Sequence, residues 1–112
     1  GVGQFEDGGS PIALWAGISP AGPLTELHKK IDRSCQTIGL NAESRAYLPH
    51  ITVARLNKSS GSTHSFLEEN ANLISAKTSV DQFCLYESIL GKSGATYNVI
   101  HRYPLRNDFK TF

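Results

Sequence analysis

The spacing of apolar residues changes at Pro23, and this change constrains the fold more than any other feature of the sequence. Before it, Ile12–Ile18 is a short apolar run between Gly, Ser and Pro residues, which predicts a buried strand. After it, apolar residues recur at the spacing of a helix face: Leu24, Leu27, Ile31, Cys35 and Ile38. This spacing predicts an amphipathic helix that has Pro23 in its first turn and ends just before Gly39, so the chain must combine helices with strands.

The remaining segments complete a mixed α and β architecture. Four of them have the composition of strands: Val2–Phe5, Pro49–Leu56, Gln82–Leu90 and Thr96–Leu105. Ser65 and Glu68 form a capping-box pattern for a second, short helix that reaches about Leu73. The order β-β-α-β-α-β-β predicts an α+β fold, an α/β sandwich in which helices cover a largely antiparallel sheet.

Length and charge bound the class of protein. A chain of 112 residues fits one globular domain. The 11 Lys and Arg residues against 10 Asp and Glu residues create no field that would draw the chain to a duplex or to a membrane. We find no apolar stretch near the roughly 20 residues that cross a bilayer and no signal peptide, so we expect a cytoplasmic protein. Cys35 and Cys84 lack the spacing of a metal site, and we expect neither a metal nor a cofactor.

The segment Pro49–Val53 brings chemical groups to one face of a predicted strand. Alternate side chains of a strand share a face, so His50 and Thr52 should project together while Ile51 and Val53 turn into the core. An imidazole transfers protons near neutral pH, and a hydroxyl donates a hydrogen bond to a phosphate oxygen. So short a pattern also occurs in ordinary strands, and the spacing alone leaves both interpretations open.

The other three histidines have weaker settings. His28 precedes Lys29 and Lys30 on the predicted helix, so we expect it to be solvated. His64 adjoins the start of the second helix. His101 alternates with Val99 and Tyr103 in the last predicted strand. This pattern leaves open whether His101 faces a cleft or is half-buried.

The longer segment Arg45–Arg55 resembles the second H-x-T-x motif of the 2H phosphoesterase superfamily. The specific likeness is to its RNA 2′,3′-cyclic phosphodiesterase branch, also called 2′-5′ RNA ligase, in which an aromatic residue precedes Pro-His and Thr-x-Ala-Arg follows. Flanking segments agree in order with that branch: Gly1–Phe5, Leu14–Gly17, Phe83–Ser88, Gly94 and Tyr97. The resemblance therefore spans nearly the whole chain.

The resemblance implies metal-free opening of a 2′,3′-cyclic phosphate at an RNA end to a 2′-phosphate, with two histidines as general base and general acid. His50 would be one of them, and Thr52 would hold the non-bridging oxygens. Arg55 has the opposite strand parity from His50 and would reach phosphate only if a bulge re-aims it. Tyr47 and Tyr97 are candidates for stacking a base and Arg45 for contacting the RNA backbone, with rim packing or solvation as alternatives.

One departure from the family limits these expectations. Members carry two H-x-T-x motifs on two pseudo-symmetric lobes, whereas none of His28, His64 and His101 has Thr two residues later. We therefore expect residues 1–112 to be either a single domain or the C-terminal portion of such a fold, and the absence of any Met favours the second. Such a portion would be weakly active alone and would associate with itself or with the other half as a separate polypeptide.

Two other hypotheses remain. A non-enzymatic module would bind RNA or nucleotide phosphate ends without turnover, and a plain structural domain would use His50 as an ordinary strand residue. A second H-x-T motif on an upstream segment or a separate chain would favour the enzyme, and its true absence would favour the binding module.

Overall fold

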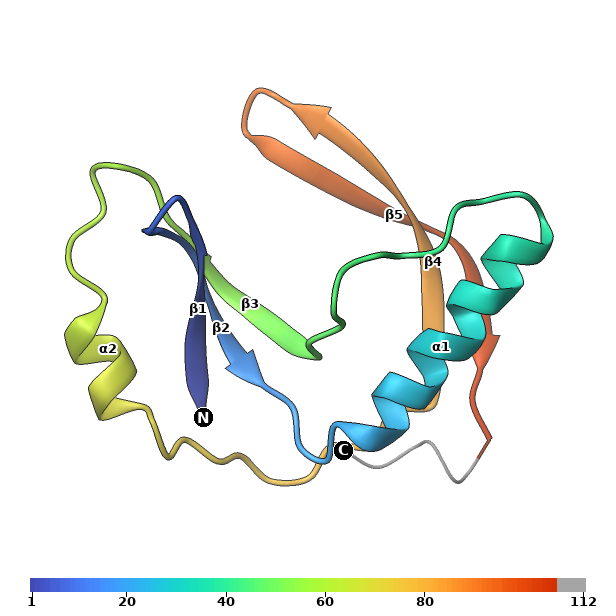
Figure 1. Cartoon of the computed structure of the whole chain (residues 1–112), viewed down its shortest axis with the longest axis horizontal. Helices are drawn as coiled ribbons and strands as arrows, with labels where there is room; N and C mark the ends of the chain where they lie inside the picture. The colour runs from blue at the N-terminus through green and yellow to red at the C-terminus, as the bar shows by residue number, and fades with distance from the viewer. Residues whose placement is uncertain (107–112) are drawn as a thin grey trace. The chain divides into compact units, whose positions relative to one another are not determined.

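The computed structural model describes residues 1–106 and places its elements in the predicted order (Figure 1). The elements are β1 (Val2–Asp7), β2 (Ser10–Gly17), α1 (Gly22–Thr37), β3 (His50–Arg55), α2 (His64–Glu69), β4 (Gln82–Gly91) and β5 (Gly94–Pro104). Every strand pair is antiparallel, which confirms the α+β class. The strands form two sheets rather than one, and the chain divides into two compact units at Ala76 and Lys77.

The first unit is built on a three-stranded sheet in the order β1-β2-β3. Gly17 pairs with His50 and Trp15 pairs with Thr52, but Leu14 pairs with Ala54, so Val53 is an extra residue in β3. Such a bulge shifts the parity of every later residue of its strand. Arg55 therefore pairs with Ala13 on the same face as His50 and Thr52, and its predicted opposite parity is wrong.

The two faces of this sheet meet different parts of the chain. We call the face that carries Phe5, Trp15, His50, Thr52 and Arg55 the site face. On the other face the Thr63 hydroxyl, at the start of α2, donates a hydrogen bond to Gln4 of β1 at 2.7 Å. The deepest apolar positions are in the middle of β2, where Ala13 is 2% exposed and Leu14 is 8% exposed.

Ile51 and Val53 do not enter a core, and this prediction is wrong. Ile51 is 59% exposed and Val53 is 53% exposed. Their strand is the edge of the sheet, whereas α2 is attached through Gln4 at the opposite edge, on β1. Strand parity predicts which side chains share a face, but coverage of that face depends on elements distant in sequence.

Helix α1 begins and ends within one residue of the predicted bounds. Pro23 lies in its first turn, and Gly39 follows its end with a φ of +97°, the left-handed conformation that glycine adopts most easily. Helix α2 differs from its prediction because it ends at Glu69. Its first turn has no side-chain cap, and the Glu68 carboxylate instead pairs with His64 at 3.2 Å. The helices of residues 1–106 all lack the combination of length and apolar character that spanning a bilayer requires.

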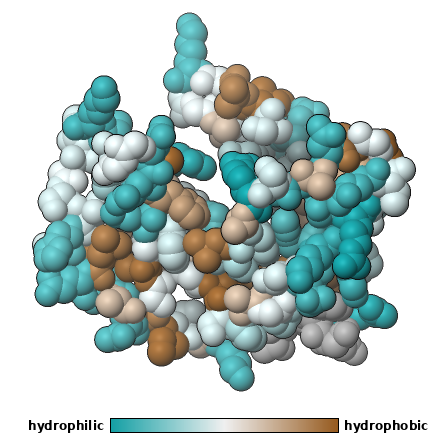
Figure 2. Space-filling model, viewed as in Figure 1, coloured by the Kyte–Doolittle hydropathy of each residue, from teal (hydrophilic) through white to brown (hydrophobic). Residues whose placement is uncertain are grey.

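The second unit consists mainly of a long hairpin. Strands β4 and β5 pair from Gln82 with Pro104 to Gly91 with Gly94, and Gly94 has a φ of +118° at the turn. Many of its apolar side chains are exposed, and Leu90 is 84% exposed. Apolar patches are also visible on the molecular surface (Figure 2). A two-stranded hairpin with little coverage is marginally stable by itself.

Packing at Gly3 predicts a stability effect that also bears on the site. A Cβ at Gly3 would overlap the Trp15 ring, whereas a Cβ at Gly17 would meet its nearest atoms at 3.6 Å, an ordinary contact. We expect Gly3→Ala to lower the free energy of unfolding by about 1–3 kcal/mol, since the indole must move. Gly17→Ala should change it by less than about 0.5 kcal/mol. Denaturant titration followed by fluorescence of the single tryptophan measures both, and equal effects would contradict the prediction.

Candidate functional site

A cavity of about 600 Å³ lies at the site face of the first unit, beside His50. Phe5 on β1, His28 on α1 and loop 43–48 line it together with His50. The loop runs from the end of α1 back to the start of β3, so residues distant in sequence meet there. The cavity therefore gathers three of the predicted site residues: His50, Tyr47 and Arg45.

The His50 ring is held in one orientation by its neighbours. Its Nδ1 lies 2.7 Å from the Leu48 carbonyl oxygen, and a carbonyl only accepts hydrogen bonds, so Nδ1 carries the proton. In the neutral ring Nε2 is then the nitrogen with a free lone pair. Phe5 meets the ring edge-on at 4.8 Å between centroids, and Trp15 lies at 6.3 Å. The arrangement suits a group that takes or gives a proton at Nε2.

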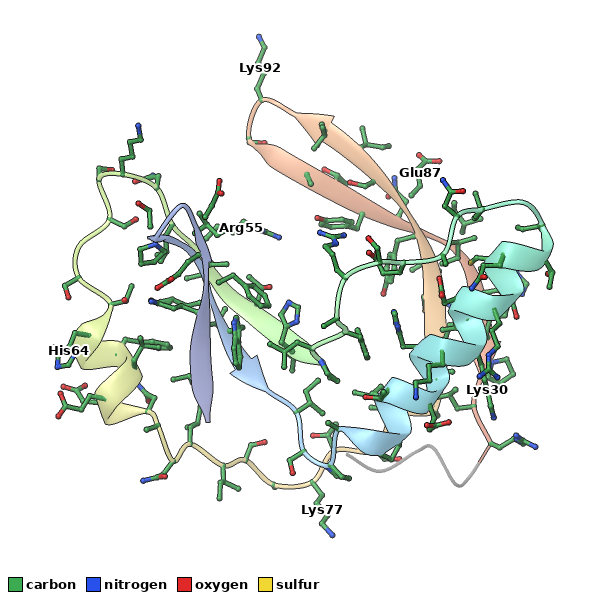
Figure 3. All side chains as sticks on the ribbon, in the orientation of Figure 1. Lys30, Arg55, His64, Lys77, Glu87 and Lys92 are labelled. Atoms are coloured by element: carbon green, nitrogen blue, oxygen red, sulfur yellow. The ribbon has the colours of Figure 1, made fainter. Side chains whose placement is uncertain are left out.

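Thr52 and Arg55 extend the site face along β3. Thr52 is two residues from His50, about 7 Å along a strand, and shares its face but does not line the cavity. The Arg55 side chain projects from β3 on that face (Figure 3). Within residues 1–106 neither side chain has a hydrogen bond or an ion pair, so both are available to a ligand.

Tyr47 and His28 form a stacked pair in the wall of the cavity. Their rings are 4.1 Å apart between centroids and nearly parallel at 5°. Burial raises the pKa of the Tyr47 phenol, which favours its protonated form. His28 is half-buried, so its predicted solvated position is wrong. The prediction rested on the two lysines that follow His28 in the helix. Nothing in the neighbouring sequence indicates that the loop before β3 returns to α1 and covers His28.

Arg45 shares the cavity with an acidic partner, Glu43, which the sequence pattern does not predict. Its Nε lies 3.2 Å from Glu43 Oε1, and its backbone N–H donates to the same oxygen at 3.1 Å. The side-chain hydrogen bond from Arg45 lowers the pKa of Glu43, and the same bond raises the pKa of Arg45. Both groups are solvent-exposed, so the pair is weak and screened by salt. A phosphate at Arg45 would compete with Glu43.

Tyr97 has a different setting from the other predicted residues. It lies on β5 in the second unit, opposite Ser88, and is 60% exposed. Its role in stacking a base stays a prediction. The described part of the chain, residues 1–106, contains no group of three or more His, Cys, Asp or Glu side chains that could hold a metal ion.

Comparison with known proteins adds a family-level finding. Residues 1–91 match the model described as the 2′-5′ RNA ligase superfamily. The chain is 31% identical over 107 residues to an RNA 2′,3′-cyclic phosphodiesterase of Geobacillus stearothermophilus. The aligned residues cover 94% of this chain and 33% of that protein. It is 27% identical over 97 residues to the protein of the same name from Archaeoglobus fulgidus, covering 87% of this chain and 54% of the relative.

A third relative, also named RNA 2′,3′-cyclic phosphodiesterase, comes from Aeropyrum pernix. It is 25% identical over 104 residues, which cover 90% of this chain and 59% of that protein. The chain therefore spans between about a third and three-fifths of the length of these curated relatives. No solved structure shows a significant match to the chain.

Proposed function

The chain belongs to the 2′-5′ RNA ligase superfamily, also known as the 2H phosphoesterases, and from that membership we propose that it opens 2′,3′-cyclic phosphates at RNA ends to 2′-phosphates. The observation that carries the proposal is the hydrogen bond from His50 Nδ1 to the Leu48 carbonyl. That bond leaves Nε2 as the proton-transfer atom of a ring beside a cavity of about 600 Å³. The names of the three relatives support the same substrate class.

The proposed reaction balances as a hydrolysis. His50 Nε2 takes a proton from water while the water oxygen forms a bond to phosphorus. The bond from phosphorus to the 3′ oxygen breaks, and a general acid protonates that oxygen. The product carries a 2′-phosphate and a free 3′-hydroxyl, and no oxidant or second substrate is consumed.

Two side chains of β3 are proposed to contact phosphate groups of the RNA end, Thr52 at the cyclic phosphate and Arg55 further along the strand. The Thr52 hydroxyl donates a hydrogen bond to a non-bridging oxygen as negative charge develops there. The bulge at Val53 places the Arg55 guanidinium on the same face, which supports a phosphate contact for it. A guanidinium can donate two parallel hydrogen bonds to phosphate oxygens, which suits it to this role.

Other residues are proposed to bind the rest of the RNA end. Tyr47 lines the cavity and offers an aromatic surface for a base, supported by its stacking on His28. Arg45 lies in the same wall and would contact the RNA backbone when released from Glu43. Tyr97 remains a candidate for a second base contact.

The general acid is proposed to be a second histidine in an H-x-T-x motif, which residues 1–112 do not include. We also propose that the chain acts as the C-terminal portion of a two-lobed fold, with a second lobe or a second copy covering part of its surface. Exposed apolar side chains on β3 and on the β4–β5 hairpin support this, Ile51 and Leu90 among them.

Product analysis tests the proposed function. The 112-residue chain is incubated with an RNA ending in a 2′,3′-cyclic phosphate, and the phosphate position of the product is read by ³¹P NMR. We expect a 2′-phosphate only, at a rate unchanged by EDTA, because the proposed proton transfers need no metal ion. A 3′-phosphate product would overturn the mechanism. Tight binding with no opening even at high chain concentration and after long incubation would favour the non-enzymatic binding module over an enzyme that lacks only its general acid.

A further inference from the structure

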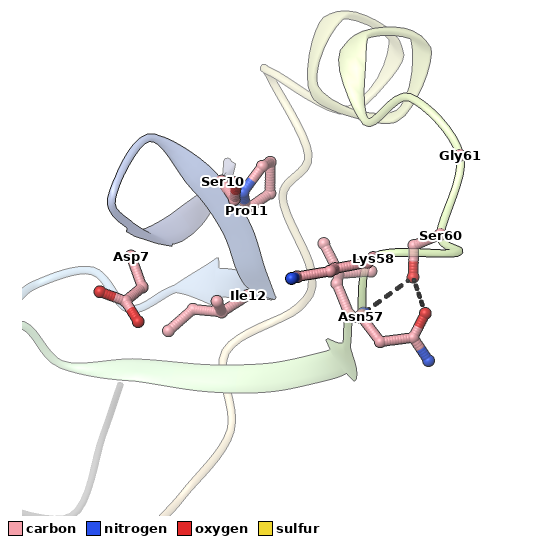
Figure 4. A pocket seen from close by; sticks show the side chains of 9 residues that line it. Asp7, Ser10, Pro11, Ile12, Asn57, Lys58, Ser60 and Gly61 are labelled. Carbon is pink, nitrogen blue, oxygen red and sulfur yellow. Dashed lines mark hydrogen bonds between the residues drawn. The ribbon is translucent and has the colours of Figure 1, made fainter.

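A second cavity of about 470 Å³ lies in the first unit, where the β1–β2 turn faces the loop that follows β3. Asp7 and Ser10 line it on the β1–β2 side, and Asn57, Lys58 and Ser60 line it on the loop side (Figure 4). Ile12, the extra residue that forms the bulge in β2, lines both this cavity and the one beside His50. The two cavities are therefore neighbours.

The loop that carries Lys58 is held in place by its own hydrogen bonds. The Asn57 side-chain oxygen accepts bonds from the Ser59 N–H at 2.9 Å and the Ser59 hydroxyl at 2.6 Å. The Ser60 hydroxyl accepts a bond from the Asn57 N–H at 3.0 Å. These bonds define the position from which Lys58 extends toward the β1–β2 strands (Figure 4). Lys58 has no ion-pair partner within residues 1–106.

Strand β3 runs from the cavity beside His50 to the loop that lines the second cavity, although Thr52 and Arg55 line neither cavity. His50, Thr52 and Arg55 occupy one face because of the bulge, and the strand ends at Arg55, three residues before Lys58. From His50 to Arg55 the strand covers about 16 Å, at roughly 3.3 Å a residue. A ligand whose terminal phosphate lies at His50 must therefore extend beyond one nucleotide to reach the second cavity.

We propose that this second cavity, the Lys58 subsite, binds the nucleotides that precede the cyclic phosphate, with Arg55 and Lys58 contacting their phosphodiester oxygens. The inference rests on the proposed function and makes the preferred substrate an oligonucleotide end rather than a free cyclic mononucleotide. Positive side chains bind such a backbone without regard to sequence. Asp7 lines the same cavity and would repel the phosphate, so of the two charged residues that line the cavity Lys58 attracts the backbone and Asp7 repels it.

Binding of two probes tests the subsite. The probes are a mononucleotide and a tetranucleotide, each with a 2′-phosphate end, titrated into the 112-residue chain by calorimetry at low salt. Lys58→Gln should weaken tetranucleotide binding about threefold, since exposed ion pairs are worth little, and should leave the mononucleotide unchanged. The salt dependence of tetranucleotide binding should fall by about 0.7 in log–log slope, the contribution of one phosphate on a single strand. Asp7→Asn should strengthen tetranucleotide binding.

Lys92→Gln is the matched control, because it removes the same charge from a lysine at the β4–β5 turn that lines neither cavity. It should leave both affinities unchanged. Equal weakening by Lys58→Gln and Lys92→Gln would show nonspecific attraction and overturn the inference. So would equal affinity of the unmodified chain for the two probes. Mononucleotide binding that His50→Gln weakens would uphold the cyclic-phosphate site even if the Lys58 subsite failed.

Discussion

Replacing His50 with Gln is expected to slow the opening of a 2′,3′-cyclic nucleotide by the 112-residue chain by about 10²–10⁴-fold, the usual contribution of a general acid or base. The physical reason is that Nε2 is the ring nitrogen left free by the hydrogen bond to Leu48. A Gln amide can form hydrogen bonds but cannot take a proton from water at neutral pH. Initial rates at saturating nucleotide, followed by chromatography of the product, measure the loss.

His64→Gln is the control for this variant. His64 lies on α2, where it pairs with Glu68, and it lines neither cavity. Its substitution should leave the rate within a factor of about two, as for most surface positions. If His50→Gln kept the parent rate, or if both variants lost activity equally, His50 would not be the proton-transfer group. Unfolding curves of both variants separate lost chemistry from lost structure.

The second large effect concerns the chain as a whole. We expect the 112-residue chain to open a 2′,3′-cyclic nucleotide about 10²–10⁴-fold more slowly than the Archaeoglobus fulgidus relative, of which it covers 54%. One histidine cannot serve as base and acid on opposite sides of the phosphorus in a single step. The two proteins are assayed side by side at equal concentration and saturating nucleotide.

Comparable rates for the two proteins would contradict this expectation and would mean that the chain holds its own second proton-transfer group. The structure then selects His28 as the first residue to replace, because it lines the same cavity as His50. His28→Phe would keep a ring beside Tyr47 while removing the titratable nitrogens, and so would distinguish proton transfer from packing.

Local patterns predicted the element order and both ends of α1. Pro23 restricts the backbone at the start of the helix and Gly39 accepts the conformation at its end, and each acts over a few residues. That His50 and Thr52 project from the same face of one strand also follows from local strand geometry. The capping-box prediction at Ser65 is wrong, because α2 begins at His64 and Ser65 therefore lies inside the helix, where Glu68 pairs with His64.

What the sequence by itself determined is therefore the set of elements and the face shared by His50 and Thr52. Only the tertiary structure decided that Arg55 joins that face, that Ile51 and Val53 are exposed, and that His28 meets Tyr47. A bulge depends on register with the neighbouring strand, and burial depends on which distant element covers a face. These contacts join residues that are far apart in the chain, so the spacing of neighbouring residues cannot predict them.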